Sequence, residues 1–573
     1  MSTKPESYSL LWPANYPPHP TSHLNPRAVN DLSLDNTLAA FDRNRPIQDN
    51  LRQIIFNLTT DPAVIRYRQA ILADIDASPA LFDAFSQVLP LINAIGAYRQ
   101  SHDRRKLSLQ EVAWRASELE YLLDSVTILQ NAFTTVGPHH LKSAGLQGLY
   151  QLINQVAQSE PFQRLKKELP EILPKLRSNV SVTIGVNLDR ELRPVEATLV
   201  SINKQKFDTA PLLDRLLGRR DKEFHGIAPI HKAPIDIYGA SGSDGEYSRH
   251  GRNNPLLAPL FRDLANVLEK ISKPISQALQ HYVNLNGHFL SNLRRDISFY
   301  LAAIQLTHRL REQNLPLCQP EIVDSDLPVC EIDQSYNLNL AHHFMTTHPG
   351  AQIANRVIQN DIRLNQDGAI QILTGPNQGG KTTYTQMVGI NQILAQAGLY
   401  VPGTAARITP VDNIYTHYPV EEELELATGR FGDEAQRLAE IFAAATPRSL
   451  ILLNESLAST SPGESIYLAQ DIVRILRRMG ARAVFNTHLH ELAASVDQLN
   501  RDTAGMSRII SMIASAQKTA DHSGAIQRNY KIIPGPPLGH SYAKEIAQRY
   551  GISYEQLTDT LQNRGILGET DQD

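Results

Sequence analysis

The chain has 573 residues, which is too long for one compact core and suggests three or four domains of about 150 residues each. It contains 55 Lys and Arg against 59 Asp and Glu, a formal net charge of −4. This balance excludes a protein held to nucleic acid by bulk positive charge, but it does not exclude a local basic groove. Cys318 and Cys330 cannot form a disulfide framework, and no apolar run approaches the roughly 20 residues that span a bilayer. We therefore expect a cytoplasmic, multidomain protein.

The first third of the chain is predicted to be a tail followed by helices. Residues 1–30 are rich in Pro, Ser and Asn and indicate an N-terminal tail or arm. From residue 31 to 177 the apolar spacing is mostly helical, and Asp61 followed by Pro62 is typical of a helix start. One helix is indicated by an apolar stripe at Leu119, Leu122, Leu123, Val126 and Leu129.

A small insert is predicted between two helical arms. Apolar residues alternate between Val180 and Ile202, which predicts two strands, and a Gly- and Ser-rich loop covers residues 239–254. We place the insert at residues 178–255 and returning helices at 256–330. From 331 to 550 short apolar strands alternate with helical segments, as in an α/β domain, and residues 551–573 are predicted to be a helical tail.

The segment from Gly375 to Thr382 fits the phosphate-binding pattern G-x-x-x-x-G-K-[ST]. A predicted strand at Ile370–Leu373 leads into it, and a predicted helix at Thr383–Ala397 follows. Backbone N–H groups of such a loop point at phosphate oxygens, while Lys381 reaches the β- and γ-phosphates and the Thr382 hydroxyl can ligate Mg²⁺. The alternative is a glycine turn that matches by accident, which the strand-then-helix context disfavours.

Two further strands end in polar residues. Residues 449–453 are apolar and lead into Asn454 and Glu455, where P-loop ATPases carry an acid that supports Mg²⁺. Asn454 has no charge, so Glu455 is the candidate general base that accepts a proton from an attacking water. The alternative is a strand that simply ends in a polar turn.

Residues 482–486 form the other strand and lead into His488, which can hydrogen-bond the γ-phosphate and sense hydrolysis. A metal site built from His488, His490 and Glu491 is the competing interpretation. A strand-to-helix turn would splay the two histidines, and no further His or Cys lies nearby in sequence. We expect Cys318 and Cys330 to be small buried residues, since they lack Cys-x-x-Cys spacing.

These motifs, in this order, resemble the MutS family of mismatch-repair ATPases, which are related to ABC ATPases. The resemblance begins at Asn360-Asp-Ile362 and Thr374-Gly-Pro-Asn-Gln-Gly-Gly-Lys-Thr-Thr383 and extends over about 200 residues. It continues through Ala397–Pro402, Ile408–Asp412, Asn454-Glu455, Thr487-His488, Tyr530-Lys531 and Ser541-Tyr542. A weaker match covers Asp31–Asp35 and Asp61–Arg68.

The resemblance implies a fold and a set of site residues. The fold would be a helical core and lever with a small β-containing, clamp-like insert, followed by a P-loop, ABC-type α/β ATPase domain. ATP and Mg²⁺ would be the cofactors, Glu455, His488 and Lys381 the catalytic residues, and Thr382, Asn454 and Glu455 the Mg²⁺ site. The nucleotide-binding residues would be Gly375, Pro376, Asn377, Gln378, Gly379, Gly380, Lys381, Thr382, Thr383, Asn360 and Ile362.

The resemblance also implies partners. ATPase domains of the family pair, so we expect a homodimer with short C-terminal helices, from Ala543 to Arg564, assisting. Ser459-Thr-Ser461 falls in the loop that contacts the partner subunit in the family. The insert lies where the family grips duplex DNA, and between Asp189 and Lys232 it holds nine Lys or Arg against seven Asp or Glu. A solvated surface is the alternative interpretation of this modest excess of positive charge.

Three departures from the family pattern limit what the resemblance implies. Asn454 replaces the usual acid and would weaken the support of Mg²⁺ and slow turnover, although an Asn oxygen can still orient a metal-bound water. The signature segment is Gly429-Arg-Phe431 in place of a Ser-Thr-Phe run, and Arg430 would have to substitute electrostatically. We also expect that the mismatch-reading and connector domains of the family have no room before the helical core.

The leading hypothesis is a MutS-type protein that couples ATP binding and hydrolysis to a clamp-like grip on duplex or branched DNA in repair or recombination. The second hypothesis is a nucleotide-gated protein scaffold with little turnover and no direct DNA binding. Asn454 and Gly429 favour the second hypothesis and Glu455 opposes it. An ABC-transporter subunit is disfavoured, because the Leu-Ser-Gly-Gly-Gln signature is missing and about 330 residues precede the ATPase region.

Overall fold

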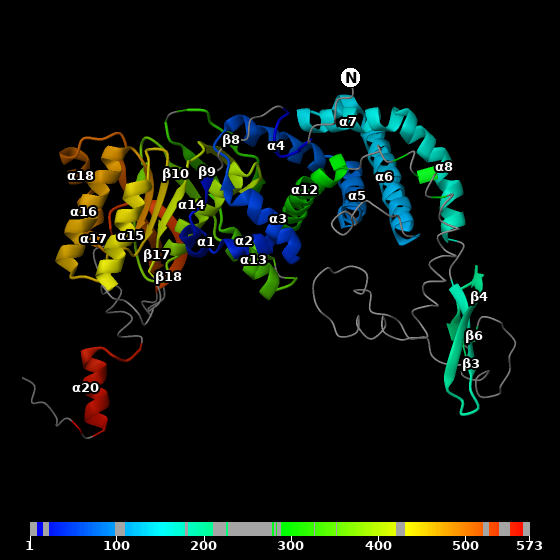
Figure 1. The fold of residues 1–573 in the computed structure, drawn as a ribbon. Helices are drawn as coiled ribbons and strands as arrows, with labels where there is room; N and C mark the ends of the chain where they lie inside the picture. Colours follow the sequence, from blue (N-terminus) through cyan, green and yellow to red (C-terminus); the bar gives the residue numbers. More distant parts are fainter. Residues whose placement is uncertain are drawn as a thin grey trace, which may run out of the picture. The chain divides into compact units, whose positions relative to one another are not determined.

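The structure, a computed structural model, describes residues 8–14, 22–97, 109–177, 181–209, 225–226, 275, 278–279, 282, 288–325, 327–350, 352–419, 430–518, 526–537, 550–564 and 566. They form two compact units, one within residues 1–9 and Ser78–Ile297 and the other within Leu10–Ala77 and Ser298–Asp573. The boundary falls inside helix α12 (His288–Glu312), drawn in green in Figure 1.

The first unit consists mainly of helices, as the apolar spacing predicted. They are α5 (Pro79–Ala97), α6 (Leu109–Val136), α7 (Ala144–Gln158) and α8 (Glu160–Arg177). The apolar stripe of α6 faces inward: Leu119 is buried in a cluster with Leu165 of α8 and with Tyr282. The Tyr282 hydroxyl donates a hydrogen bond to Glu168 at 2.6 Å, so the buried ring keeps a partner for its polar end.

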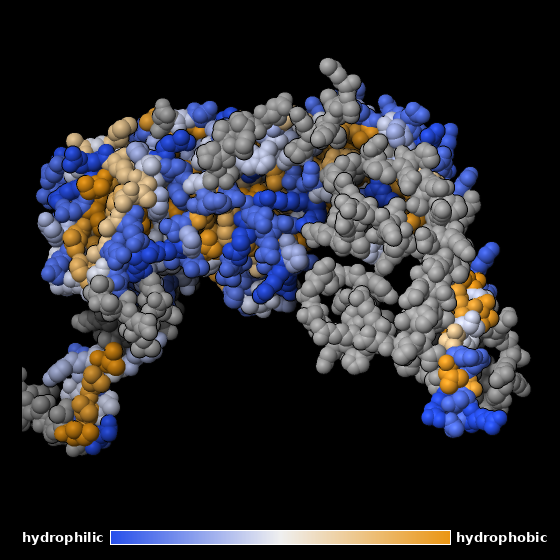
Figure 2. All heavy atoms as spheres, in the orientation of Figure 1, coloured by the Kyte–Doolittle hydropathy of each residue, from blue (hydrophilic) through white to orange (hydrophobic). Residues whose placement is uncertain are grey.

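The two predicted strands of the insert form a hairpin. Strand β3 (Ser181–Leu188) pairs antiparallel with β4 (Pro194–Asn203), and short β5 (Asp208–Thr209) pairs in parallel with β6 (His225–Gly226). The hairpin carries an apolar surface, visible in Figure 2, made by Ile184, Val186, Leu188, Leu192, Val195 and Val200. Five of the nine Lys and Arg counted between Asp189 and Lys232 lie outside the described residues, namely Arg215, Arg219, Arg220, Lys222 and Lys232, and so does the predicted loop at 239–254.

The second unit includes the N-terminal helices. They are α1 (Pro26–Asp31), α2 (Leu34–Phe41), α3 (Arg45–Ile55) and α4 (Pro62–Asp76), accompanied by the paired strands β1 (Ser22–His23) and β2 (Asn57–Leu58). Asp61 caps α4 by accepting a hydrogen bond from the backbone N–H of Ala63 at 2.7 Å, as the Asp-Pro pair predicted. The predicted helical segment 31–177 is therefore divided between the two units at Ala77, and the other domain boundaries remain predictions.

A six-stranded sheet forms the centre of the second unit, in the order β14-β15-β16-β11-β17-β18. All neighbours pair in parallel except β17 and β18, which are antiparallel. The strands are β11 (Ile370–Thr374), β14 (Ile414–His417), β15 (Leu450–Asn454), β16 (Arg482–Asn486), β17 (Ile509–Lys518) and β18 (Ile526–Pro534). Strands β11, β15 and β16 confirm the three strands predicted around the phosphate motif.

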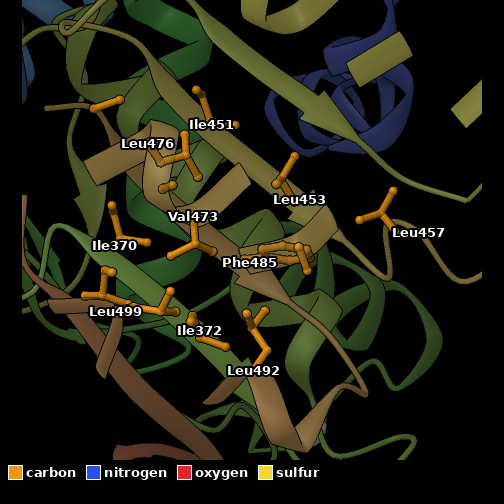
Figure 3. Close-up of a cluster of buried hydrophobic side chains, with 14 of the residues drawn as sticks. Ile370, Ile372, Ile451, Leu453, Leu457, Val473, Leu476, Phe485, Leu492 and Leu499 are labelled. Carbon is orange, nitrogen blue, oxygen red and sulfur yellow. The ribbon is translucent and has the colours of Figure 1, made fainter. Parts of the chain in front are cut away.

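Helices cover the sheet and bury its aliphatic side chains. They are α14 (Lys381–Gln396), α15 (Arg430–Ala444), α16 (Pro462–Met479), α17 (His490–Ala494) and α18 (Val496–Asp502). Figure 3 shows one core cluster, in which Phe485 of β16 and Ile372 of β11 lie close to Val473 of α16. Because both faces of a parallel sheet are covered, its central strands are rich in apolar residues, as in the Leu-Ile-Leu-Leu run of β15. The predicted α/β fold is confirmed.

A second, four-stranded sheet lies beside the phosphate motif, with the order β10-β9-β13-β8. It is formed by β8 (Glu321–Ile322), β9 (Cys330–Ser335), β10 (Asn360–Leu364) and β13 (Ala405–Ile408). Helix α13 (Leu338–Thr347) lies between β9 and β10 in the chain. Two further strands, β7 (Leu317–Cys318) and β12 (Val401–Pro402), pair with each other. Cys330 is fully buried and Cys318 is half-buried, and both are free thiols. Burial raises the pKa of each to about 11, so they act as small packing residues.

The C-terminal part of the chain contains helix α20 (Tyr554–Asn563), which lies within the predicted helical range 543–564. Residues 543–549 of that range are outside the described residues. Tyr554 and Leu557 of α20 are exposed. In the described part of the chain, no helix combines the length and apolar character needed to cross a membrane.

Candidate functional site

The phosphate motif forms a tight loop between β11 and α14. Gly375 has φ 137° and Gly380 has φ 90°, and Gln378 between them has φ 59°. A Cβ atom at Gly375 would approach the Cβ of Ala514 to 2.8 Å, so this position requires glycine for space as well as for conformation. Helix α14 begins directly after Gly380, which aims its first backbone N–H groups back toward the loop.

Lys381 is held inside this loop. Its ammonium group donates to the carbonyl oxygens of Gly375 at 3.0 Å and Pro376 at 3.2 Å, and the residue is only 4% exposed. Burial lowers the pKa of Lys381, and the nearby carboxylate of Glu455 partly offsets this effect. A poorly hydrated cation at the start of a helix favours an anionic ligand.

A cavity of about 420 Å³ opens over the loop. Residues 377–383 form part of its lining, and Glu455, which follows β15, reaches it as well. The lining also includes residues that the sequence interpretation did not single out as site residues, namely Leu340 and Phe344 of α13, Arg356, Ile358, Tyr384 and Tyr530. The cavity thus combines polar and cationic residues with apolar and aromatic ones. That combination suits a ligand with phosphates attached to a flat ring.

Asn360 and Ile362, both predicted beside a nucleotide base, occupy different environments. Asn360 lines the cavity, but its side chain is engaged with β18: it donates to the Tyr530 carbonyl at 3.1 Å and accepts from the Ile532 N–H at 2.8 Å. Ile362 is fully buried in β10 and is not among the residues that line the cavity. Ile358, four residues earlier, lines it instead.

The ends of β15 and β16 bring Asn454, Asn486 and Thr382 together. The Thr382 hydroxyl donates to Oδ1 of Asn454 at 3.1 Å, and the amide of Asn486 donates to the same oxygen. Two oxygen ligands of the kind that Mg²⁺ prefers therefore lie side by side, with Glu455 following Asn454 directly in the chain. The residues fit a Mg²⁺ ion bound partly through water, held by neutral oxygens from Thr382 and Asn454.

Glu455 and His488, which follow β15 and β16, are also in contact. Nε2 of His488 lies 2.9 Å from Oε1 of Glu455, and the Glu455 N–H donates to the Asn486 carbonyl at 2.8 Å. The hydrogen bond from His488 lowers the pKa of Glu455, opposed by partial burial, so the carboxylate is ionised at neutral pH. Glu455 has φ 52°, an uncommon backbone conformation for a non-glycine residue that occurs often at functional sites.

The competing metal site does not assemble in the described ranges. No group of three or more His, Cys, Asp or Glu side chains there is placed to hold a metal ion. His488 is engaged with Glu455, and burial lowers the pKa of His490.

The loop after Glu455 is closed by hydrogen bonds within the chain. Ser459 donates to the buried carboxylate of Glu434 in α15 at 2.6 Å, and Thr460 and Ser461 both donate to Glu464. Gly429 of the predicted signature segment lies outside the described residues, as do Ser541 and Tyr542, and Arg430 is the first residue of α15.

Comparison with known proteins accounts for most of the chain. The MutS2 N-terminal domain matches residues 60–313 and MutS domain V matches residues 371–561. The DNA mismatch repair protein MutS of Lactobacillus johnsonii is 28% identical over 469 residues, which are 77% of this chain and 50% of that protein.

Other relatives have a higher sequence identity to this chain over shorter segments. MutS of Shouchella clausii is 37% identical over 263 residues, 45% of this chain and 29% of that protein. The DNA mismatch repair protein MutS 2 of Halobacterium salinarum is 36% identical over 143 residues, 25% of this chain and 17% of that protein. The chain thus spans half the length, or less, of these relatives. With both domain matches in chain order, it belongs to the MutS family and combines a MutS2-type N-terminal domain with a MutS domain V of the ABC-type ATPase fold.

Proposed function

We propose that this protein is an ATP-dependent DNA-binding protein of the MutS type, which couples ATP binding and hydrolysis to a clamp-like grip on duplex or branched DNA in repair or recombination. The observation that carries the proposal is the cavity in which Lys381, Thr382 and Glu455 meet. Family membership supports it.

ATP fits the cavity by its chemistry. The triphosphate would lie on the N–H groups of residues 377–383 with Lys381 compensating its charge, and the base would lie among Phe344, Ile358 and Tyr530. Mg²⁺, when bound with the nucleotide, would neutralise charge on the phosphates. Thr382 and Asn454 are the residues that would hold it.

Glu455 is the group that can act on water. Its carboxylate lines the cavity and is ionised, so it can accept a proton from a water that attacks the γ-phosphate. His488 orients this carboxylate through the 2.9 Å contact. The products would be ADP and phosphate.

DNA contact and subunit pairing are proposed from family membership and from a few residues. In the hairpin, Arg190, Lys204 and Lys206 are exposed cations that can meet phosphates, whereas Arg193 is paired with Asp189 and Glu191. The loop at Ser459–Ser461 would contact a second subunit, which makes a homodimer the expected assembly.

Steady-state ATP hydrolysis with and without duplex and branched DNA, beside Glu455→Gln, tests the proposal. We expect turnover that DNA changes and that Glu455→Gln reduces by roughly 100-fold or more while ATP binding is kept. Salt titration of DNA binding checks the phosphate contacts.

A nucleotide-gated scaffold is the second candidate, and the neutral Asn454 favours it, because a carboxylate would support Mg²⁺ more strongly. ATP binding without turnover above that of Glu455→Gln, together with no effect of DNA, would establish the scaffold and exclude the clamp.

A further inference from the structure

One oxygen atom at the edge of the central sheet accepts two hydrogen bonds. Oδ1 of Asn454 receives the Thr382 hydroxyl at 3.1 Å and the side-chain amide of Asn486. Asn454 and Asn486 are direct register partners of β15 and β16, and the Asn486 carbonyl also binds the Glu455 N–H. Both side chains are almost completely buried, at 5% and 0% exposure.

The chemistry of an amide makes this orientation consequential. A carboxylate offers an oxygen at both ends, so it can face a cation in either of its two orientations. An asparagine offers an oxygen at one end and an NH₂ group at the other. If the side-chain amide of Asn454 rotated by about 180°, its NH₂ group would face Thr382. A cation bound there would then meet two hydrogens in place of an oxygen.

Among the described residues, the side chain of Asn486 makes no hydrogen bond other than the one to Asn454. Its own Oδ1 is buried and has no hydrogen-bond partner among the described residues. A fully buried amide with one unsatisfied end costs stability compared with an apolar side chain of the same shape. We therefore assign the function of the Asn486 side chain to its hydrogen bond with Asn454.

We infer that Asn486 is a positioning residue, which holds the Asn454 amide with its oxygen toward Thr382 and so makes a neutral asparagine usable as a Mg²⁺ ligand. The inference rests on the proposed function, because it concerns the Mg²⁺ that accompanies the nucleotide. It assigns to Asn486 a role that depends on the residue at position 454. With a carboxylate at that position, the role would disappear.

A double-mutant cycle tests this dependence. Asn486→Leu, which keeps the approximate size and removes the donor, is made in the wild-type chain and in Asn454→Asp. Binding of a fluorescent ATP analogue is then titrated with Mg²⁺, and EDTA gives the metal-free affinity. With Asn at 454, Asn486→Leu is expected to raise the half-effective Mg²⁺ concentration on the order of tenfold, as for other residues that orient metal ligands. With Asp at 454, it is expected to raise it less than about twofold.

Thermal unfolding accompanies each variant, and Asn486→Ala replaces Asn486→Leu if the leucine does not fit. Asn391→Leu is the matched control, since Asn391 is a fully buried asparagine whose amide donates to Ser335 away from the cavity. It should leave the Mg²⁺ dependence unchanged.

Equal Mg²⁺ shifts in both backgrounds would overturn the inference and leave the proposed function standing. If the wild-type protein binds the analogue no more tightly with Mg²⁺ than in EDTA, the Mg²⁺-dependent site of the proposed function fails, and the inference fails with it.

Discussion

Nε2 of His488 lies 2.9 Å from Oε1 of Glu455, so the residue that follows β15 and the second residue after β16 meet across two neighbouring strands. The contact both orients the carboxylate and keeps it ionised, because the hydrogen bond lowers the pKa of Glu455. If Glu455 is the general base, His488 acts on hydrolysis through it.

The first prediction concerns this pair. His488→Ala should lower the ATP hydrolysis rate by about tenfold or more, with little effect on ATP affinity, because the base loses its orienting partner but the phosphate loop is unchanged. Single-turnover hydrolysis and equilibrium binding measure the two quantities separately. In Glu455→Gln, the same histidine change should have no further effect on rate. An additive loss in the double variant would mean that the two residues act independently.

A second prediction concerns Lys381. Lys381→Met should weaken ATP binding by roughly 100-fold, about 2.7 kcal/mol. The buried ammonium lies inside the phosphate loop, where it would compensate the charge of the triphosphate. Isothermal titration with ATP and with ADP measures this, and the loss should be larger for ATP. Lys531→Met is a suitable control, because Lys531 is exposed and donates to the Gln359 carbonyl at 2.5 Å. Equal losses for both variants would contradict the role of Lys381.

A third prediction separates two isoleucines. Ile358→Ala should weaken the binding of ATP by about tenfold and leave the binding of inorganic triphosphate unchanged, because Ile358 is an apolar residue of the cavity lining that would pack against the base. Ile362→Val should instead lower the free energy of unfolding by about 1 kcal/mol without changing affinity, since Ile362 is fully buried. Competition binding and urea denaturation give the two readouts. The opposite pattern would place the base beside Ile362.

A fourth prediction concerns pH and His417, at the end of β14. This ring is 2% exposed, its Nδ1 lies 2.7 Å from the Ser456 hydroxyl, and burial lowers its pKa from 6.5 to about 4. The folded protein therefore holds His417 neutral while the unfolded chain protonates near pH 6.5. Stability from this residue is present above pH 6.5 and is lost as the pH falls toward 4, by on the order of 3 kcal/mol.

Urea denaturation between pH 7 and pH 4 measures this loss. His417→Asn, whose amide can replace the contact of Nδ1, should show a smaller fall in unfolding free energy over that interval, whatever its stability at pH 7. His348→Asn, at the exposed residue directly after α13, should follow the wild type. Parallel curves for His417→Asn and the wild type would show that another group dominates.

Local patterns predicted the centre of the site well. The strands β11, β15 and β16 are short aliphatic runs that end in polar residues, and the glycine motif has a fixed relation to the strand before it and the helix after it. Parallel strands end at one edge of a sheet, so Lys381, Asn454, Glu455 and His488 meet there without further information.

The apolar and aromatic residues of the cavity lining could not be predicted in this way. Tyr530 follows the phosphate loop by about 150 residues and reaches the cavity because β18 pairs with β17 beside β11. The choice between Ile358 and Ile362 depends on where β10 begins, since one residue precedes that strand and the other lies within it. The packing of residues 22–77 with the ATPase sheet is likewise a long-range contact. Helical periodicity in the sequence predicts the helices but not the sheet against which they pack.

The register of β15 and β16 sets a limit on how this site can change. Asn454 lies opposite Asn486 and Leu453 opposite Phe485, so a slip of one residue would put an aliphatic side chain at the catalytic edge and a polar amide in the core. Adding or removing one residue within either strand would therefore misplace several site residues at once. Evolution and engineering can exchange side chains here, but they cannot change the lengths of these two strands one residue at a time.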